Sequence, residues 1–167
     1  MKSVISILIV LPVFLSASVA FADPELNNLT VDVIDGDTLR ISGSKEKIRL
    51  LGIDACEVSQ KAKTLTGQVI DCGDPATTEL TRLTVGQKVS CRVTGRDRYK
   101  RLLARCGTLG TPDLGAELIK QGLAVVYRYK SKPTVPEYVL IEDRARTSKL
   151  GLWSLDFEEP FLHRRRK

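Results

Sequence analysis

The sequence is poor in the residues that bind zinc. It has a single histidine, His163, and a single methionine and tryptophan. None of its four cysteines forms a Cys-x-x-Cys pair. Zinc sites need cysteines and histidines clustered at short spacings. The sequence therefore excludes a zinc centre.

Long apolar runs are also scarce, and the one that occurs lies at the N-terminus. Residues 4–15 are almost wholly apolar, follow a basic start and precede Ala-Phe-Ala at residues 20–22. This is the pattern of a secretory signal peptide. The run is shorter than the ~20 residues of a membrane-spanning helix. We therefore expect cleavage after Ala22, no membrane anchor, and a secreted or periplasmic protein.

The remaining chain has the size and composition of about one globular domain, with 43% hydrophobic and 28% charged residues. Residues 23–28 are predicted to form a loose polar lead-in. Residues 156–167 are predicted to form a basic C-terminal tail, of which residues 164–167 are expected to be a mobile end. The loss of residues 1–22 removes one lysine and leaves an excess of about five positive charges. This charge favours a polyanion such as nucleic acid, although solubility alone explains it nearly as well.

The cysteines predict two disulfides. An even number in an exported protein is typical of disulfide bonding, and four cysteines allow three pairings. Cys91 lies seven residues before Arg98, and Cys106 lies seven after Tyr99. A hairpin with Arg98 and Tyr99 at its tip would place the two thiols opposite each other. We therefore expect Cys91–Cys106, which leaves Cys56–Cys72.

Hydrophobic alternation predicts five short strands, and helical spacing predicts three helices. The strands are expected at 30–34, 38–41, 47–53, 89–93 and 102–106. The helices are expected at 74–85, 112–121 and 135–149, and residues 57–71 are expected to be a loop or lid. A helix between the third and fourth strands fits the oligonucleotide-binding (OB) barrel plan. The predicted fold class is α+β, a five-stranded OB-fold β-barrel with three helices.

Acidic residues gather where two of these strands end. Hard cations such as calcium prefer oxygens from carboxylates, backbone carbonyls and water. We expect Asp37 and Asp54 to be calcium ligands, with the Ala55 backbone carbonyl as a third. Asp35 would act through water or orient Asp37. The Asp-Gly-Asp at 35–37, taken alone, is explained by turn chemistry.

Two arginines and one glutamate complete the candidate site. Arg49 and Arg101 lie in apolar-flanked segments, where a guanidinium must be paired. Each arginine fits either an internal salt bridge or a planar fork for phosphate oxygens. Glu57 is placed to orient, or accept a proton from, a metal-bound water. The alternative for Glu57 is a solvated loop residue.

Tyrosines alternate with basic residues in two segments. Arg98 and Tyr99 form one pair, and Tyr127 and Tyr129 flank a second arginine, Arg128. Such tyrosines stack on bases or sugars, and we expect these four residues to bind substrate. Exposed tyrosines beside basic residues also occur in proteins without such a ligand.

Residues 29–155 resemble the staphylococcal nuclease (thermonuclease) family. The resemblance is carried by residues 33–38, 49–54 with Glu57, 97–101, 121–124 and 151–154. Two positions depart from the family pattern. The family usually has proline where this chain has Cys56, and commonly has glycine where it has Lys100.

The resemblance implies a nuclease-like domain over 29–155 that cleaves DNA and RNA with calcium. It matches Asp37 and Asp54 to the calcium carboxylates and Ala55 to the ligand that uses its backbone carbonyl. It matches Arg49, Glu57 and Arg101 to the catalytic residues, and Tyr99 and Tyr127 to nucleotide contacts.

The resulting hypothesis is an exported, monomeric, calcium-dependent nuclease that prefers single strands. Two other hypotheses stay open. One is an OB-fold module that binds nucleic acid without cleaving it. The other is an accessory protein of the cell envelope or of exopolysaccharide biosynthesis, because some relatives of the family resemble members of such gene clusters.

Overall fold

The computed structural model describes residues 24–166, so the predicted signal peptide lies outside the described residues. A six-stranded sheet forms the body of the protein, in the order β1-β8-β9-β4-β3-β2. Its strands are β1 (Glu25–Leu29), β2 (Val31–Asp35), β3 (Thr38–Ile41), β4 (Lys47–Leu50), β8 (Val89–Arg96) and β9 (Leu102–Gly107). All neighbouring strands pair antiparallel except β4 and β9, which are parallel.

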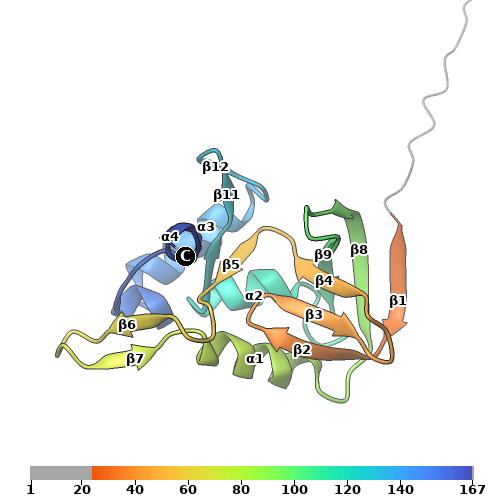
Figure 1. The fold of residues 1–167 in the computed structure, drawn as a ribbon, viewed down its shortest axis with the longest axis horizontal. Helices are drawn as coiled ribbons and strands as arrows, with labels where there is room; N and C mark the ends of the chain where they lie inside the picture. Colours follow the sequence, from red (N-terminus) through yellow and green to blue (C-terminus); the bar gives the residue numbers. More distant parts are fainter. Residues whose placement is uncertain (1–23, 167) are drawn as a thin grey trace, which may run out of the picture.

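The sheet curls because its two edge strands are consecutive in the chain. β1 pairs with β8 at one edge and β2 pairs with β3 at the other, with only Thr30 between β1 and β2. The two edges therefore approach each other at this residue, and the sheet curls into a half-barrel of the OB type, called the barrel below (Figure 1). The predicted α+β, OB-type fold class is confirmed.

Smaller sheets and the helices surround the barrel. The remaining strands are β5 (Ile53–Ala55), β6 (Lys61–Lys63), β7 (Val69–Asp71), β10 (Ala124–Val126), β11 (Arg128–Tyr129), β12 (Lys132–Pro133) and β13 (Asp156–Phe157). The helices are α1 (Asp74–Thr84), α2 (Leu114–Lys120), α3 (Tyr138–Thr147), the 3-10 helix η1 (Gly151–Ser154) and α4 (Pro160–Arg166). Strand β5 pairs with β10, β11 with β12, and β6 with both β7 and β13. Among residues 24–166, no helix has the length and apolar character needed to cross a bilayer.

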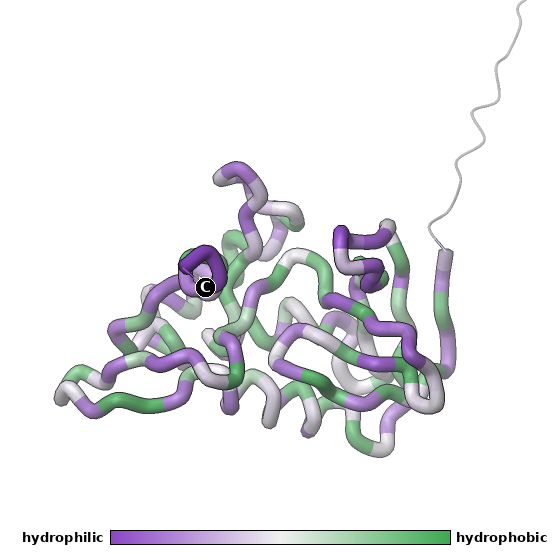
Figure 2. The backbone as a smooth tube through the Cα atoms, viewed as in Figure 1, coloured by the Kyte–Doolittle hydropathy of each residue, from purple (hydrophilic) through white to green (hydrophobic). Residues whose placement is uncertain are grey.

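The core follows from period-two alternation in the barrel strands. In β8, Val89, Cys91 and Val93 are buried while the residues between them are exposed. Figure 2 shows the resulting mixture of apolar and polar residues along the barrel strands. Helix α1 packs on β2 so closely that a Cβ at Gly36 would lie 2.6 Å from the Ala76 Cβ.

Both predicted disulfides are present. Cys91 and Cys106 are direct partners in the β8–β9 register, with Cα atoms 4.1 Å apart. Cys56 and Cys72 close the base of the segment that contains β6 and β7, with Cα atoms 5.6 Å apart. Two disulfides are typical of proteins that fold in an oxidising compartment.

The prediction of one strand over 47–53 was wrong. The chain leaves β4 after Leu50, turns at Leu51 and Gly52, and begins β5 at Ile53. Gly52 has φ +87°, and a Cβ there would lie 2.5 Å from the Val135 Cγ2. Glycine adopts this conformation at no steric cost, so the strand breaks here.

Three segments predicted to lack regular structure are ordered. The lead-in contributes β1, because its backbone completes the edge of β8. The loop or lid over 57–71 forms the β6–β7 hairpin. The tail forms β13, which pairs with β6, and α4, which packs on β5. Helix α4 is therefore a fourth helix, one more than predicted. Residue 167 lies outside the described residues, and the mobility of residues 164–167 stays a prediction.

Candidate active site

Strand register brings the two predicted calcium ligands to Arg49. Thr38 pairs with Arg49 across β3 and β4, and the Leu50 N–H donates to the Asp37 carbonyl at 2.8 Å. The turn at Gly52 then reverses the chain, so that Asp54 on β5 comes back beside Arg49. The broken strand is thus what assembles the acidic pair.

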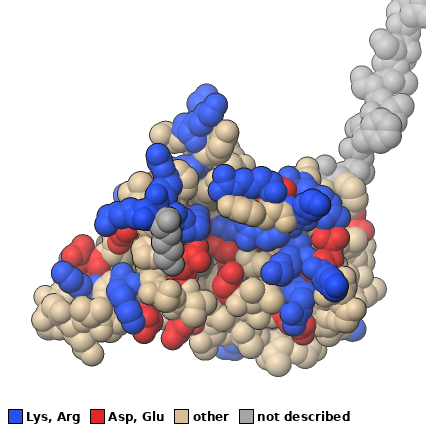
Figure 3. Space-filling view, viewed as in Figure 1, with Lys and Arg blue, Asp and Glu red and all other residues tan. Residues whose placement is uncertain are grey.

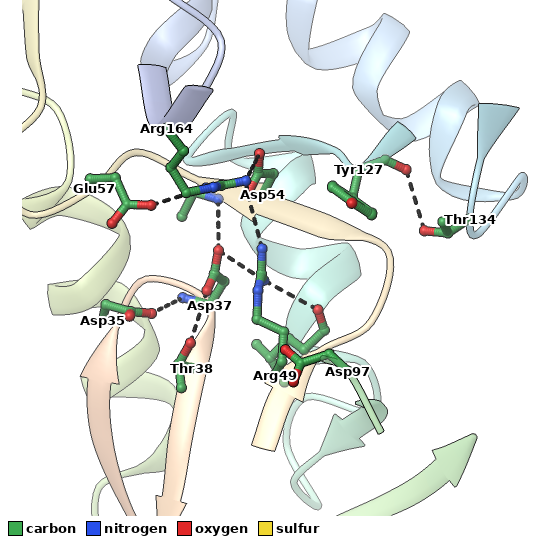
Figure 4. A network of polar contacts seen from close by, with 12 residues as sticks. Asp35, Asp37, Thr38, Arg49, Asp54, Glu57, Asp97, Tyr127, Thr134 and Arg164 are labelled. Atoms are coloured by element: carbon green, nitrogen blue, oxygen red, sulfur yellow. Dashed lines mark hydrogen bonds and ion pairs between the residues drawn. The ribbon is translucent and has the colours of Figure 1, made fainter. Parts of the chain in front are cut away.

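One guanidinium joins both carboxylates. Arg49 Nη1 lies 2.8 Å from Asp37 Oδ2, and Nη2 lies 2.9 Å from Asp54 Oδ1 (Figure 4). The exposed fractions are 9% for Arg49 and 1% for Asp54. Two carboxylates share this one positive charge, and Arg164 and Glu57, described below, add one charge of each sign, so the group is one positive charge short of neutral. A buried charge deficit of this kind favours an additional cation.

Asp37 is oriented by its neighbours. Its Oδ1 accepts from the Thr38 hydroxyl at 3.0 Å, and its Oδ2 accepts from the Ala55 N–H at 3.1 Å. The Asp37 N–H donates to Asp35 Oδ1 at 3.1 Å, so Asp35 helps to fix the backbone of Asp37. Burial, together with the nearby Asp37 charge, raises the pKa of Asp35 to about 6.

Asp54, like Asp35, is a carboxylate whose charged form is destabilised by burial. Burial raises the pKa of Asp54 to about 6, even though Arg49 and Arg164 act to lower it. The Asp37 charge also raises it. Positive charge at this carboxylate offsets the cost of desolvating it.

Arg101 reaches the same group through a hydroxyl. Its Nη1 lies 3.4 Å from Thr38 Oγ1, which itself donates to Asp37. Its Nε donates to Asp97 Oδ2 at 2.7 Å, across the turn between β8 and β9. Arg101 is thus brought to the site, but in this structure it is paired with Asp97.

Glu57 lies on the loop that follows β5. The Cys56–Cys72 disulfide fixes the residue before it, and its N–H donates to the Gln60 Oε1 at 3.2 Å. Its carboxylate lies beside the acidic pair and accepts a hydrogen bond from Arg164 at 3.0 Å. Cys56, where the family usually has proline, therefore anchors this loop covalently.

Arg164 belongs to the site, and sequence reasoning gave it no role. Its Nη2 lies 2.8 Å from both Asp54 oxygens, in addition to the contact with Glu57. Arg164 projects from α4, which lies 110 positions further along the chain than Asp54. The only sequence signal was its place in a basic terminal run, and such a run does not indicate where it docks.

Asp35, Asp37, Arg49 and Glu57 line a cleft of about 1440 Å³, whereas Asp54 is buried and does not line it. The four residues predicted to bind substrate all line it: Arg98, Tyr99, Tyr127 and Tyr129. Lys47, Arg96, Arg128 and Lys130 line it too. Figure 3 shows lysine and arginine side chains gathered over the upper middle of this face, with acidic side chains below and between them. Basic side chains arranged in this way suit the binding of a phosphate backbone.

The tip of the β8–β9 hairpin stands over the cleft. The side chain of Tyr99 is 64% exposed, and the guanidinium carbons of Arg98 and Arg101 lie 4.7 Å and 5.5 Å from its ring centroid. Lys100 has φ +67°, the left-handed region that favours glycine. The turn that the family commonly makes with glycine is therefore kept here with a lysine.

The donor set fits a hard cation that keeps part of its water. Within residues 24–166, no three histidine, cysteine, aspartate or glutamate side chains cluster closely enough to hold a metal by themselves. The protein offers two carboxylates, and Asp54 already holds a guanidinium cation on both of its oxygens. Calcium completes its shell with backbone carbonyls and water. The predicted Ala55 carbonyl contact stays a prediction.

Comparisons with known proteins agree with the fold. The family model described as staphylococcal nuclease homologue matches residues 47–155. An uncharacterized endonuclease of Escherichia coli O157:H7 is 33% identical over 147 residues, which cover 86% of this chain and 88% of the relative. A micrococcal nuclease of Shigella flexneri is 32% identical over 146 residues, covering 81% and 78%. Succinoglycan biosynthesis protein ExoI of Rhizobium meliloti is 31% identical over 122 residues, covering 72% and 61%.

A curled OB-type sheet with basic and aromatic side chains along one cleft has the features of a protein that binds a polyanion such as nucleic acid. The chain belongs to the staphylococcal nuclease family. Nuclease activity is supported at the level of the family, whereas one relative bears a biosynthesis name.

Proposed function

We propose that this protein is an exported, calcium-dependent nuclease that hydrolyses phosphodiester bonds of DNA and RNA. One observation carries the proposal. A single buried guanidinium, that of Arg49, lines a basic cleft and lies 2.8 Å from Asp37 and 2.9 Å from Asp54. The charge deficit of this group gives a cation a reason to bind where a phosphate would enter.

The carboxylates and arginines of the candidate site each have a role in this proposal. Asp37, Asp54 and the Ala55 carbonyl would hold a calcium ion, which would supply positive charge to the phosphoryl group. Arg49 and Arg101 stabilise the negative charge that develops on the other oxygens during in-line displacement. Arg101 must exchange its contact with Asp97 for one with the phosphate.

Glu57 positions the attacking water. It lies beside the acidic pair at the edge of the cleft, and it is fixed by Gln60 and the disulfide. A carboxylate within hydrogen-bond reach of a water orients it and accepts its proton.

The walls bind the polymer. Tyr99, Tyr127 and Tyr129 present rings for stacking, and Arg98 adds charge beside Tyr99. Stacking requires unpaired bases, so a single strand is the favoured substrate.

The test is an assay of the oxidised protein on single-stranded DNA and on RNA, with calcium and with a chelator. We expect cleavage of both polymers with calcium and none with the chelator. Glu57→Ala should lose most of the cleavage rate while it still binds DNA. Cleavage that persists in the chelator would contradict the proposal.

The alternatives give different results in the same assay. A binding module would retain the strand in a salt-sensitive complex and release no products. An envelope accessory protein would neither bind nor cleave nucleic acid at physiological salt.

A further inference from the structure

Helix α4 places a positive charge at the carboxylates that the proposed function assigns to calcium and to the attacking water. Arg164 Nη2 lies 2.8 Å from each oxygen of Asp54, and Nη1 lies 3.0 Å from Glu57 Oε1 (Figure 4). One guanidinium therefore joins the predicted cation ligand to the predicted catalytic glutamate.

This contact separates Asp54 from the cleft. Asp54 is 1% exposed and does not line the cleft, whereas Ala55 and Glu57, which follow it, do. Arg164 itself lines the cleft at 35% side-chain exposure. A cation that enters the cleft thus meets Arg164 before it reaches the Asp54 carboxylate.

The segment that carries Arg164 is tied to the loop that carries Glu57. Strand β13 pairs with β6 through Phe157 and Ala62. The buried Gln60 bridges the two segments, because its Nε2 donates to the Glu158 carbonyl at 2.7 Å and its Oε1 accepts from the Glu57 N–H. These contacts hold α4 over the site in addition to its own packing on β5.

Helix α4 itself is lightly held. It has seven residues, and Pro160 is its one buried residue. Phe161 and Leu162 are both exposed. A segment with so little buried apolar surface opens at low cost while the rest of the fold stays intact. The helix also lies outside residues 47–155, which match the family model.

We propose that Arg164 is a further residue of the candidate active site, an internal cation that holds Asp54 and Glu57 until a divalent cation replaces it. This inference rests on the proposed function, because it takes Asp54 as a calcium ligand. Arg164 acts through these two carboxylates and sets the calcium affinity of the site. Its withdrawal exposes Asp54 and frees Glu57.

The expected size of the effect follows from competition for the same oxygens. Apparent affinity falls by the fraction of molecules in which the site is open. If Arg164 holds Asp54 in about nine molecules of ten, calcium binds about tenfold more weakly than it would to the open site.

The test is calorimetric titration of the oxidised protein, starting at Asp23, with calcium chloride alone. The variants are Arg164→Ala and Arg164→Gln, the second of which keeps the length of the side chain without its charge. The control is Arg166→Ala, which removes the same charge from the same helix. Arg166 is paired with Glu158 and its side chain is 76% exposed.

We expect both Arg164 variants to bind calcium about tenfold more tightly than the wild type, and Arg166→Ala to match the wild type. We also expect calcium to accelerate amide hydrogen exchange in α4 of the wild type. Equal or weaker calcium binding by both Arg164 variants would overturn the proposal, as would unchanged exchange in α4.

Cleavage of single-stranded DNA by the same samples separates this proposal from the proposed function. Cleavage with unchanged calcium affinity in the Arg164 variants would reject the role of Arg164 alone. Tighter calcium binding without any cleavage would reject the nuclease function alone. Failure of every variant to bind calcium would reject both.

Discussion

The two sides of the cleft are built differently. The barrel side consists of Asp37, Arg49 and Asp54, which lie on or beside β3, β4 and β5. The C-terminal side consists of Glu57, Gln60 and Arg164. The first two lie on the loop between β5 and β6, which together with the β6–β7 hairpin we call the arm, and Arg164 lies on α4. On the barrel side, strand register and burial fix each group. On the C-terminal side, side-chain hydrogen bonds link segments about 100 positions apart.

Because of this difference, the barrel side is held rigidly by the strands, whereas the C-terminal side can change its conformation while the barrel stays folded. The barrel side holds buried charges whose geometry cannot change without unfolding the strands. The C-terminal side rests on a disulfide, one glutamine and a short helix. We infer that the barrel side supplies the fixed charges of the reaction and that the C-terminal side controls access to them.

The largest expected effect comes from breaking the barrel side. Arg49→Ala leaves two buried carboxylates without their shared partner, which should cost about 3 kcal/mol of stability. Loss of one charged contact to the developing phosphoryl charge should also lower the cleavage rate at least about 100-fold. Urea unfolding and initial rates on single-stranded DNA measure the two effects.

Arg40→Ala is the matched control for this variant. Arg40 lies on β3 and pairs with the half-exposed Asp32. Exposed pairs contribute less than about 1 kcal/mol. If Arg40→Ala destabilised the protein as much as Arg49→Ala, burial would not be what distinguishes the barrel side.

Each side of the cleft has one disulfide, so removing them one at a time compares the two sides directly. Their sequence separations are 16 and 15, so removal of either should cost a similar stability of about 3 kcal/mol. Replacing Cys56 and Cys72 by alanine should also lower the cleavage rate, because it releases the loop that carries Glu57. Replacing Cys91 and Cys106 should leave the rate of the folded protein nearly unchanged. Equal losses of rate would show that Glu57 does not depend on the arm.

A smaller effect is expected at Gln60. Gln60→Leu leaves the Glu57 N–H and the Glu158 carbonyl without their partner, which should cost about 2 kcal/mol. Hydrogen exchange should rise in β13 and α4 and stay unchanged in the barrel strands. Gln68→Leu, at an exposed position of the β6–β7 hairpin, is the control. It should change neither the stability nor the hydrogen exchange of β13 and α4. Faster exchange across the barrel would contradict the division into two sides.

The smallest effect is expected at the tip of the β8–β9 hairpin. Lys100→Gly relieves the cost of a left-handed lysine but makes the unfolded chain more flexible. We expect a net gain of stability of no more than about 1 kcal/mol, measured by urea unfolding. A loss of stability would mean that the Lys100 side chain contributes contacts that outweigh the strain.

The barrel side was largely predictable from the sequence. Alternation located the strands of the main sheet other than β1, and the equal spacing of Cys91 and Cys106 about the hairpin tip predicted their pairing. The structure also brings Asp37, Arg49 and Asp54 together, as the hypothesis required. Their roles in catalysis and metal binding stay predictions. The break at Gly52 was missed, because the apolar run continues through it and only the glycine marked a turn.

The C-terminal side was not predictable from local patterns. Strands β6, β7 and β13 have three residues or fewer, too short for a periodic signal. Strand β1 is polar because it lies at an edge, so its composition resembles that of a loop. Arg164 reaches Asp54 only because distant segments pair, and a run of basic residues at a terminus does not indicate this.

The most direct test of the central claim is a double-mutant cycle between Asp37 and Arg49, measured as kcat/KM on single-stranded DNA with calcium. The account predicts that Asp37→Asn and Arg49→Gln together cost much less than the sum of their separate losses in log rate, because both act at one centre. Fully additive losses would contradict it, since they would mean that the aspartate and the arginine serve the reaction independently.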